Sequence, residues 1–257
     1  MSETHPSSIQ KADTFKALHT PGTPVVLYNI WDAGSAGAVA KAGATALATG
    51  SWSVAEAQGY RDGEALPMEF LLSIVERIVA TNTLPLTVDF EGGYAVAPEE
   101  VTLNVERLIS AGAIGLNFED RVVKGKGLHT ITEQAARIRA VRAAGDQTGT
   151  PIVINARTDL FLQSKPEDHA SHISEALDRA AAYAEAGGDS FFVPGLSDAD
   201  LIQKVCTDCP LPVNVMLRDV SAQVAPLAAL GVGRISFGPT PYAAAMKGIT
   251  EQAQAFY

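Results

Sequence analysis

Short apolar runs alternate along the chain with longer stretches of mixed apolar and polar residues, and this alternation repeats eight times. The runs are continuous, span four to six residues and are rich in apolar or β-branched side chains. This pattern is typical of parallel strands that are buried on both faces. We therefore predict eight strands, at residues 24–29, 44–49, 86–90, 114–118, 152–155, 190–193, 212–215 and 234–237.

Between these runs, apolar residues recur at the spacing of an α-helix. Residues 70–78 and residues 101–109 each carry their apolar side chains along a single stripe, which predicts two amphipathic helices. Thr130 followed by Glu133 has the spacing of a capping box, so we predict that a helix begins there. Residues 197–200 predict a similar helix start, with Asp in the place of Glu.

Four glycines stand just before predicted strands in a related local sequence, at Gly43, Gly112, Gly187 and Gly231. A glycine directly after a helix supplies the left-handed residue that ends it. The glycines are 69, 75 and 44 residues apart, which corresponds to two, two and one strand–helix units. Dividing 257 residues by eight gives about 32 residues for each unit, the arithmetic of an eight-unit barrel.

These spacings predict an α/β fold of the (β/α)8 TIM-barrel type. We expect residues 1–257 to form one domain, with residues 1–12 as a flexible N-terminal tail or packed on the bottom of the barrel. An open doubly wound sheet is the alternative architecture. That fold usually has fewer strands and a glycine-rich first turn, whereas residues 29–34 read NIWDAG after the first predicted strand and lack the GxGxxG pattern.

The net charge of the chain is −10 at pH 7, from 19 Lys and Arg against 29 Asp and Glu. A diffusely acidic surface repels phosphate backbones and anionic lipid, so we expect neither nucleic-acid nor membrane partners. No apolar run approaches the length of about 18 residues that spans a membrane, and residues 1–15 lack the apolar segment of a secretion signal. Two cysteines make no disulfide framework, so we expect a cytoplasmic protein.

Carboxylates are concentrated where the third and fourth predicted strands end, and the carboxyl ends of barrel strands carry the chemistry of such folds. Asp89 and Glu91 lie two residues apart, so on a regular strand they share a face. Glu119 and Asp120 follow the neighbouring strand. Clustered carboxylates repel one another, and an all-oxygen set binds Mg²⁺ or Mn²⁺, which removes the repulsion. The alternative is a network of salt bridges that seals this end of the barrel. Arg157, at the end of the fifth strand, has a positively charged guanidinium group that can bind a carboxylate or an oxyanion through two hydrogen bonds.

Five segments together resemble the isocitrate lyase/phosphoenolpyruvate mutase superfamily and occur in its order, within residues 14–245. They are residues 29–36, 59–62, 88–94, 115–120 and 154–159. The resemblance implies a (β/α)8 barrel, commonly a homotetramer whose eighth helix is exchanged between neighbours, with a homodimer as the alternative. It also implies Mg²⁺-dependent cleavage or formation of C–C or C–P bonds in a small anionic substrate, a 2-oxo acid or a phosphonate.

The metal-binding residues implied by the resemblance are three carboxylates. Asp89 and Glu91 match the Asp-x-Asp metal motif, with Glu in the place of the second Asp, and Glu119 matches the acidic residue of a Glu-Asp motif. In the superfamily such groups hold Mg²⁺ largely through water. Arg157 matches an arginine that contacts the substrate oxygen, which implies both a catalytic and a substrate-binding role.

The substrate-binding residues implied by the resemblance follow the second predicted strand. Gly50, Ser51 and Trp52 match the segment that holds the carboxylate of the oxo acid. Asp62 matches a catalytic aspartate on a mobile loop near the site.

Residues 121–129, with the sequence RVVKGKGLH, depart from the superfamily. The lyase branch has Lys-Lys-Cys-Gly-His here, with Cys as an acid/base, and the mutase branch has a polar Lys/Thr/Asn/Ser loop. The absence of Cys argues against isocitrate or methylisocitrate lyase chemistry. Lys124 and Lys126 alternate with glycines and predict a flexible basic lid that adds positive charge over an anionic substrate. An exposed surface turn is the alternative.

The resemblance implies that a 2-oxo acid chelates Mg²⁺ and that bond scission leaves an enolate, which the metal and Arg157 stabilise. Decarboxylation, retro-aldol cleavage and P–C cleavage or transfer all fit this scheme. The acid that protonates the enolate is open, with Tyr94, His129 and Tyr242 as candidates. The alternatives are another Mg²⁺-dependent aldolase on the same barrel, and a barrel that binds 2-oxo acids without turnover.

Overall fold

The structure of the chain is a computed structural model that describes residues 6–219 and 223–257. Eight parallel strands form one sheet in the order β1-β8-β7-β6-β5-β4-β3-β2. A parallel bridge between Ile30 and Thr49 joins its two edges, so the sheet nearly closes. The strands are β1 (Val25–Leu27), β2 (Leu47–Ala48), β3 (Leu86–Asp89), β4 (Gly115–Glu119), β5 (Val153–Arg157), β6 (Ser190–Phe192), β7 (Val213–Met216) and β8 (Arg234–Ser236).

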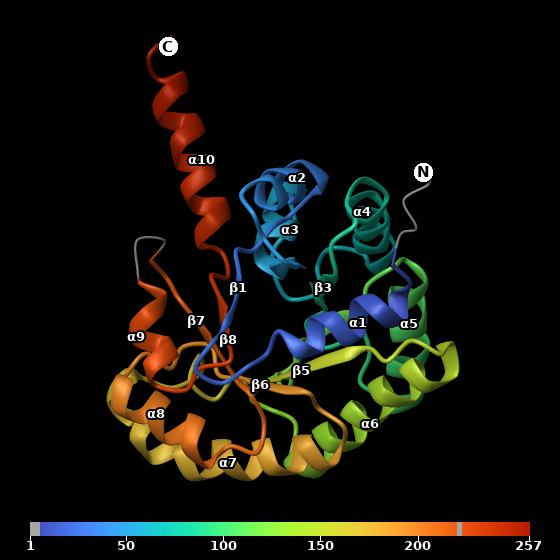
Figure 1. Cartoon of the computed structure of the whole chain (residues 1–257), viewed down its shortest axis with the longest axis vertical. Helices are drawn as coiled ribbons and strands as arrows, with labels where there is room; N and C mark the ends of the chain where they lie inside the picture. The colour runs from blue at the N-terminus through green and yellow to red at the C-terminus, as the bar shows by residue number, and fades with distance from the viewer. Residues whose placement is uncertain (1–5, 220–222) are drawn as a thin grey trace.

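Helices alternate with the strands along the chain, as Figure 1 shows. They are α1 (Ser8–Ala17), α2 (Ala33–Lys41), α3 (Ser51–Ala57), α4 (Met68–Thr81), α5 (Pro98–Ser110), α6 (Ile131–Thr148), the 3-10 helix η1 (Pro166–Asp168), α7 (His169–Glu185), α8 (Ala199–Asp208), α9 (Val224–Ala229) and α10 (Thr240–Ala253). The predicted (β/α)8 barrel is confirmed, and each observed strand overlaps its predicted range. No helix within residues 6–219 and 223–257 combines the length and the apolar character needed to cross a membrane.

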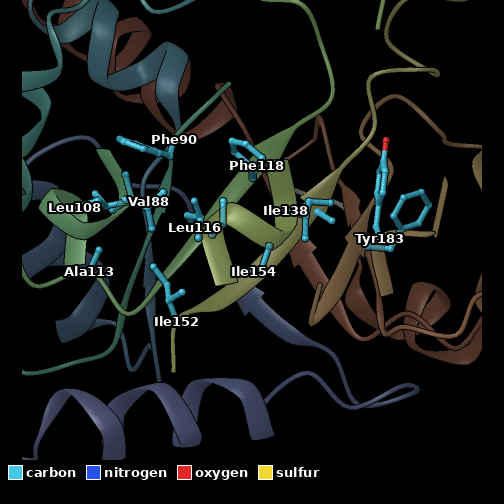
Figure 2. Packing of buried hydrophobic residues seen from close by; sticks show 14 of the residues in the cluster. Val88, Phe90, Leu108, Ala113, Leu116, Phe118, Ile138, Ile152, Ile154 and Tyr183 are labelled. Atoms are coloured by element: carbon cyan, nitrogen blue, oxygen red, sulfur yellow. The ribbon is translucent and has the colours of Figure 1, made fainter. Parts of the chain in front are cut away.

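The strands alternate between an apolar face toward the helices and a polar face toward the barrel interior. Val88, Leu116 and Ile154 are fully buried, and they belong to one apolar cluster with Leu108 of α5 and Ile138 of α6 (Figure 2). The period of two along each strand places the intervening residues inside the barrel. A continuous apolar core therefore holds the helical shell in place while the interior stays free for polar groups.

Strand register brings those interior polar residues together. Asn117 pairs with Asp89 on one side and with Asn155 on the other. Glu119 pairs with Arg157 two residues further on. Because paired residues of parallel strands point to the same face, the register places these side chains at one end of the barrel.

Helix ends follow the predicted signals with one difference. Gly43, Gly112, Gly187 and Gly231 all have φ near +90 to +100°, as the left-handed residue that ends a helix requires. The capping box of Thr130 at the start of α6 is confirmed. In the segment 197–200 the N-cap is Asp198, whose carboxylate accepts the backbone N–H of Leu201.

The first helix begins within the expected N-terminal tail. Ser7 and Gln10 form a capping box that starts α1, and Ala12 and Phe15 are buried. The ring of Phe15 lies 5.9 Å from the guanidinium of Arg234 at the start of β8. From Ser8 onward the tail is therefore a helix packed at the amino ends of the strands, and residues 1–5 lie outside the described residues.

Candidate active site

A pocket of about 410 Å³ opens at the carboxyl ends of the strands. It brings together all four residues expected to bind substrate, Gly50, Ser51, Trp52 and Arg157, with the predicted catalytic Asp62 and one of the metal-binding candidates, Asp89. Gly50 precedes α3, so the chain turns from β2 into a short helix at the pocket wall. The ring of Trp52 packs edge-on against Tyr242, with 5.8 Å between ring centroids. This contact holds the indole against the first turn of α10, which follows β8.

Arg157 is the charged centre of this pocket. Its guanidinium donates two hydrogen bonds to the carboxylate of Asp159, at 2.6 and 3.1 Å. Its Nη1 lies 2.9 Å from Glu119 Oε2 and 3.8 Å from Asp89 Oδ1. Burial lowers the pKa of Arg157, but the carboxylates of Glu119, Asp159 and Asp89 outweigh it and hold that pKa above its ordinary value. The Arg157 guanidinium is therefore held in one orientation and stays positively charged.

Glu119 is buried, and only one of its two carboxylate oxygens has a partner. Its side chain is 2% exposed, and Oε1 has no hydrogen-bond partner in the structure. Burial raises the pKa of Glu119 well above its ordinary value, although Arg157 opposes the shift. A buried carboxylate oxygen without a donor is costly, so Glu119 is suited to a further positive partner.

Asp89 is held at the pocket floor by neutral donors. The backbone N–H of Ser51 donates to Oδ2 at 3.1 Å, and the amide of Asn117 donates to Oδ1 at 3.3 Å. Asn117 is oriented in turn by Asn155 and Arg234, which donate to its oxygen at 2.8 and 2.9 Å. Asp89 therefore faces the pocket in a fixed position.

Glu91 does not share a strand face with Asp89, and that part of the sequence prediction is wrong. β3 ends at Asp89, and Glu91 has φ +50° in a turn. Its carboxylate accepts the backbone N–H groups of Gly63 and Glu64, at 2.8 and 3.0 Å. Burial, followed by the charges of Asp62 and Asp89, raises the pKa of Glu91 to about 8. The carboxylate thus lies beside the loop that carries Asp62.

The shifted pKa of Glu91 predicts how stability depends on pH. We expect the free energy of unfolding of the metal-free protein to fall as the pH rises from 4.5 to about 8. In this range folded Glu91 keeps a proton that the unfolded chain has released, so the contribution present below pH 4.5 is lost. The loss from this group is at most about 5 kcal/mol. Urea unfolding in EDTA at several pH values measures it. Glu91→Gln should flatten the dependence, and an unchanged slope would contradict the assignment.

Asp62 lies on the loop between α3 and α4, at the mouth of the pocket. Its carboxylate hydrogen-bonds to the side chain of Ser51. Partial burial and the charge of Asp89 raise its pKa, while the Ser51 contact and the more distant Arg157 oppose this. Asp62 is therefore placed beside the expected substrate carboxylate site and holds its proton more readily than a solvated aspartate.

The structure places Lys124 and Lys126 away from this pocket. Residues 121–128 form a tight turn closed by an antiparallel bridge between Arg121 and Leu128. Lys124 is exposed and lies 3.8 Å from Glu64, and Lys126 is also exposed. His129, a candidate acid, lines a different cavity with Lys124. Closure of this segment over the substrate stays a prediction.

Asp120, next to Glu119, is a buried hydrogen-bond acceptor that connects the end of β4 to Asp159 and to α7. It is fully buried and accepts hydrogen bonds from the backbone of Asp159, from Arg179 and from the hydroxyl of Tyr183, at 2.9, 3.1 and 2.8 Å. Through Asp159, this network fixes the residue that orients Arg157.

Asp120→Ala is therefore expected to lower the free energy of unfolding by about 3–5 kcal/mol, because it leaves the buried Arg179 and Tyr183 without their shared acceptor. Urea denaturation measures the change. Asp208→Ala is the matched control, since Asp208 pairs with Lys204 on the exposed face of α8, and its removal should cost less than about 1 kcal/mol. Equal losses in the two variants would contradict the role of the buried network.

A divalent cation fits this site through water rather than through three direct side-chain ligands. Within residues 6–219 and 223–257, no three His, Cys, Asp or Glu side chains are grouped closely enough to hold a metal ion. The carboxylates of Asp62, Asp89 and Glu119 nevertheless offer only oxygen ligands, and Glu119 Oε1 is a buried acceptor without a partner. Oxygen donors and retained water are what Mg²⁺ prefers.

Several pocket residues have no role in the sequence prediction. Asn117 orients Asp89, and its place two residues before Glu119 on the same strand face was the available signal. Arg218 borders the pocket two residues after the end of β7, so its place near the carboxyl end of a strand could have identified it as a site residue. Leu162 lies in a loop, and nothing in the sequence around it indicated a place in the pocket.

Comparison with known proteins agrees with the resemblance seen in the sequence. Residues 15–257 match the family described as phosphoenolpyruvate phosphomutase. A solved structure from Burkholderia cenocepacia J2315, a presumed phosphonomutase, is 48% identical with a TM-score of 0.92, over 95% of this chain and 99% of that one. An uncharacterised protein of Mycobacterium tuberculosis is 32% identical over 94% of this chain and 88% of its own length. The 2-methylisocitrate lyase of Escherichia coli K12 is 27% identical over 81% of this chain and 70% of its own length. The chain therefore belongs to the phosphoenolpyruvate phosphomutase family, within the phosphoenolpyruvate mutase/isocitrate lyase superfamily.

Proposed function

We propose that the protein is a Mg²⁺-dependent lyase or mutase that breaks or forms a bond next to the keto group of a small 2-oxo acid. One observation carries this proposal: Arg157 is fixed between Glu119 and Asp159 and points at a pocket that also contains Asp89. A charged fork that is oriented before substrate arrives stabilises negative charge as it develops on oxygen. The relatives named as a lyase and as a presumed mutase support the same reaction class.

The residues of the site are proposed to divide the reaction between metal binding, substrate binding and charge stabilisation. Asp89 and Glu119 would hold Mg²⁺ largely through water, with Mn²⁺ as an alternative. When bound, the cation would supply Lewis-acid stabilisation to the carboxylate and keto oxygens of the substrate. Gly50, Ser51 and Trp52 bind the substrate carboxylate, and Arg157 stabilises the enolate oxygen. Asp62, which hydrogen-bonds to the Ser51 side chain, would hold a proton beside the substrate.

The wall of the pocket favours C–C over C–P bond chemistry. Away from the carboxylates its lining includes four apolar side chains, Leu162, Phe192, Pro194 and Met216, beside polar residues. A second cavity of about 400 Å³ shares Leu162 and Met216 and has a mixed polar and apolar lining. Apolar side chains accept a carbon substituent at C3 of the substrate, whereas a phosphonate dianion against them would lose its hydration without compensation.

The phosphonate alternative is supported by Arg218. This residue borders both cavities, so the pocket has two guanidinium groups at its edge, Arg157 and Arg218. Paired arginines are well suited to a phosphonate. A barrel that binds 2-oxo acids without turnover also stays open, because Tyr94 and His129 do not line the pocket and no enolate acid is identified.

A substrate screen tests the proposal. Oxaloacetate, 2-oxoglutarate, 2-alkyl malates and phosphonopyruvate are incubated with the protein, with Mg²⁺ and with EDTA, and the products are identified. We expect Mg²⁺-dependent product from a carbon acid. Binding by calorimetry without product would support the binding barrel, and product only from phosphonopyruvate would support the mutase. Neither binding nor product with any acid would contradict the proposal.

The C-terminal helix supports a homo-oligomer, a homotetramer or a homodimer. α10 extends away from the barrel in Figure 1, and Pro241 is its one buried residue among those described. A cavity of about 770 Å³, larger than the pocket and less polar, lies between β1 and α2. A neighbour's α10 placed there would cover both the helix and Val26, which is 39% exposed.

Ile249→Asp is therefore expected to lower the molar mass in solution from a multiple of 26.9 kDa toward the monomer, because Ile249 is 59% exposed on α10 and would enter the interface. Light scattering coupled to size exclusion measures the mass. Leu103→Asp on α5 is the matched control, since Leu103 is similarly exposed. A wild-type monomer, or equal masses for both variants, would contradict this arrangement.

A further inference from the structure

Glu91 is joined to the loop between α3 and α4. One of its oxygens, Oε2, accepts the backbone N–H groups of both Gly63 and Glu64, at 2.8 and 3.0 Å. Glu91 is 7% exposed, so these bonds are shielded from water. Two N–H groups directed at one buried carboxylate oxygen form a specific attachment between the end of β3 and this loop.

A second contact joins the same two segments in the opposite direction. The side chain of Glu64, which is 5% exposed, accepts the backbone N–H of Tyr94 at 2.8 Å. Glu91 thus reaches from the turn to the loop, and Glu64 reaches from the loop to the turn. We call this pair of contacts the loop latch.

Backbone strain is concentrated in the loop latch. Among the described residues, the non-glycine residues with positive φ are Glu64, Glu91 and Tyr94, at 56, 50 and 56°. Residues other than glycine adopt this conformation only where surrounding contacts impose it, and such positions gather at functional sites. All three belong to the loop latch, so its hydrogen bonds compensate for an unfavourable backbone.

The loop latch determines where Asp62 lies. Asp62 precedes Gly63 directly, lines the pocket and hydrogen-bonds to the Ser51 side chain. Asp89 lines the pocket, whereas neither Glu91 nor Glu119 does. Glu91 differs from Glu119 because both of its carboxylate oxygens already accept backbone N–H groups, whereas Oε1 of Glu119 has no partner. We propose that Glu91 is a positioning residue that holds the Asp62 loop against the active site, and that it is not a ligand of the metal. The catalytic part of this inference rests on the proposed function.

The length of the side chain separates the two roles. Aspartate at this position would keep a carboxyl group that can ionise and bind a cation, but it would be one methylene too short to reach Gly63 and Glu64. Glutamine would keep the reach, because its amide oxygen can accept both N–H groups as Oε2 does, but it cannot ionise. A positioning role therefore tolerates Gln better than Asp, and a metal-ligand role tolerates Asp better than Gln.

Two measurements on Glu91→Asp and Glu91→Gln test the proposal without requiring turnover. Hydrogen exchange at the amides of Gly63 and Glu64 reports the loop latch, and Mn²⁺ affinity by electron paramagnetic resonance reports the metal site. In Glu91→Asp we expect exchange to accelerate by about tenfold or more, with the Mn²⁺ dissociation constant within about threefold of wild type. In Glu91→Gln we expect exchange close to wild type.

Glu64→Ala provides a second variant that leaves Glu91 intact, and it should also accelerate exchange at Gly63, because the contact with Tyr94 is lost. Glu56→Asp, on the exposed face of α3, is the matched control and should change neither measurement. Unchanged exchange in Glu91→Asp, or Mn²⁺ binding weakened about tenfold in Glu91→Gln but not in Glu91→Asp, would overturn the proposal. Failure of the proposed function would instead appear as no Mg²⁺-dependent product, with the exchange result unaffected.

Discussion

Asp89→Asn is expected to reduce Mg²⁺-dependent turnover of a 2-oxo acid by about a thousandfold or more. The asparagine has the same shape and can keep one hydrogen bond with Ser51 or Asn117, which lie 3.1 and 3.3 Å from the Asp89 oxygens. It lacks the negative charge that would hold a hydrated cation beside Arg157. Steady-state kinetics over a range of Mg²⁺ concentrations measures the loss.

The control for this variant is Asp208→Asn, which removes an exposed carboxylate from α8 and should leave turnover unchanged. The thermal unfolding of both variants should resemble that of the wild type, since neither change creates a cavity. Turnover by Asp89→Asn within about tenfold of the wild type would remove Asp89 from the metal site and would leave the proposed mechanism without its cation.

Arg157→Lys is the second large expected effect, a decrease in kcat of about a hundredfold to a thousandfold with a smaller change in KM. Lysine keeps the positive charge but cannot make the two parallel hydrogen bonds to Asp159 together with the ion pair to Glu119. The charge would then no longer be fixed toward the position where the enolate oxygen forms. A split between kcat and KM distinguishes this role from simple substrate binding.

Arg107→Lys serves as the control, because Arg107 forms an exposed ion pair with Glu69 and plays no part in the pocket. Its kinetics should match the wild type. A large rise in KM with unchanged kcat in Arg157→Lys would show that Arg157 binds ground state and transition state equally, and would contradict a role in stabilising the enolate.

The barrel was predictable because its signals are local and repeated. Each strand is a short apolar run, and the glycines before four of the strands have the positive φ that ends the preceding helix. The start of α1 at Ser8 was harder to predict. The helix carries few apolar residues, and Phe15 becomes buried only when the amino ends of the strands are assembled beneath it.

The candidate site was predictable where residues stand on strands in register. Glu119 and Arg157 meet because β4 and β5 pair them directly, and Asp89 joins them through Asn117. Glu91 differs because β3 ends at Asp89, and Glu91 lies in the following turn with a positive φ. Alternation along a strand says nothing about residues beyond its end. The contacts of Glu91 with the loop between α3 and α4 depend on tertiary structure alone.

The position of a bound metal decides whether Asp89 and Glu119 hold a cation beside Arg157. A crystal grown with Mn²⁺ and oxalate, a mimic of a 2-oxo acid enolate, would locate the cation by its anomalous scattering. We expect one Mn²⁺ beside Asp89 and Glu119, with oxalate oxygens against Arg157, and with Glu91 still bound to the backbone of Gly63 and Glu64. Mn²⁺ away from Asp89 and Glu119, or no Mn²⁺ in the pocket although oxalate is present, would contradict this expectation.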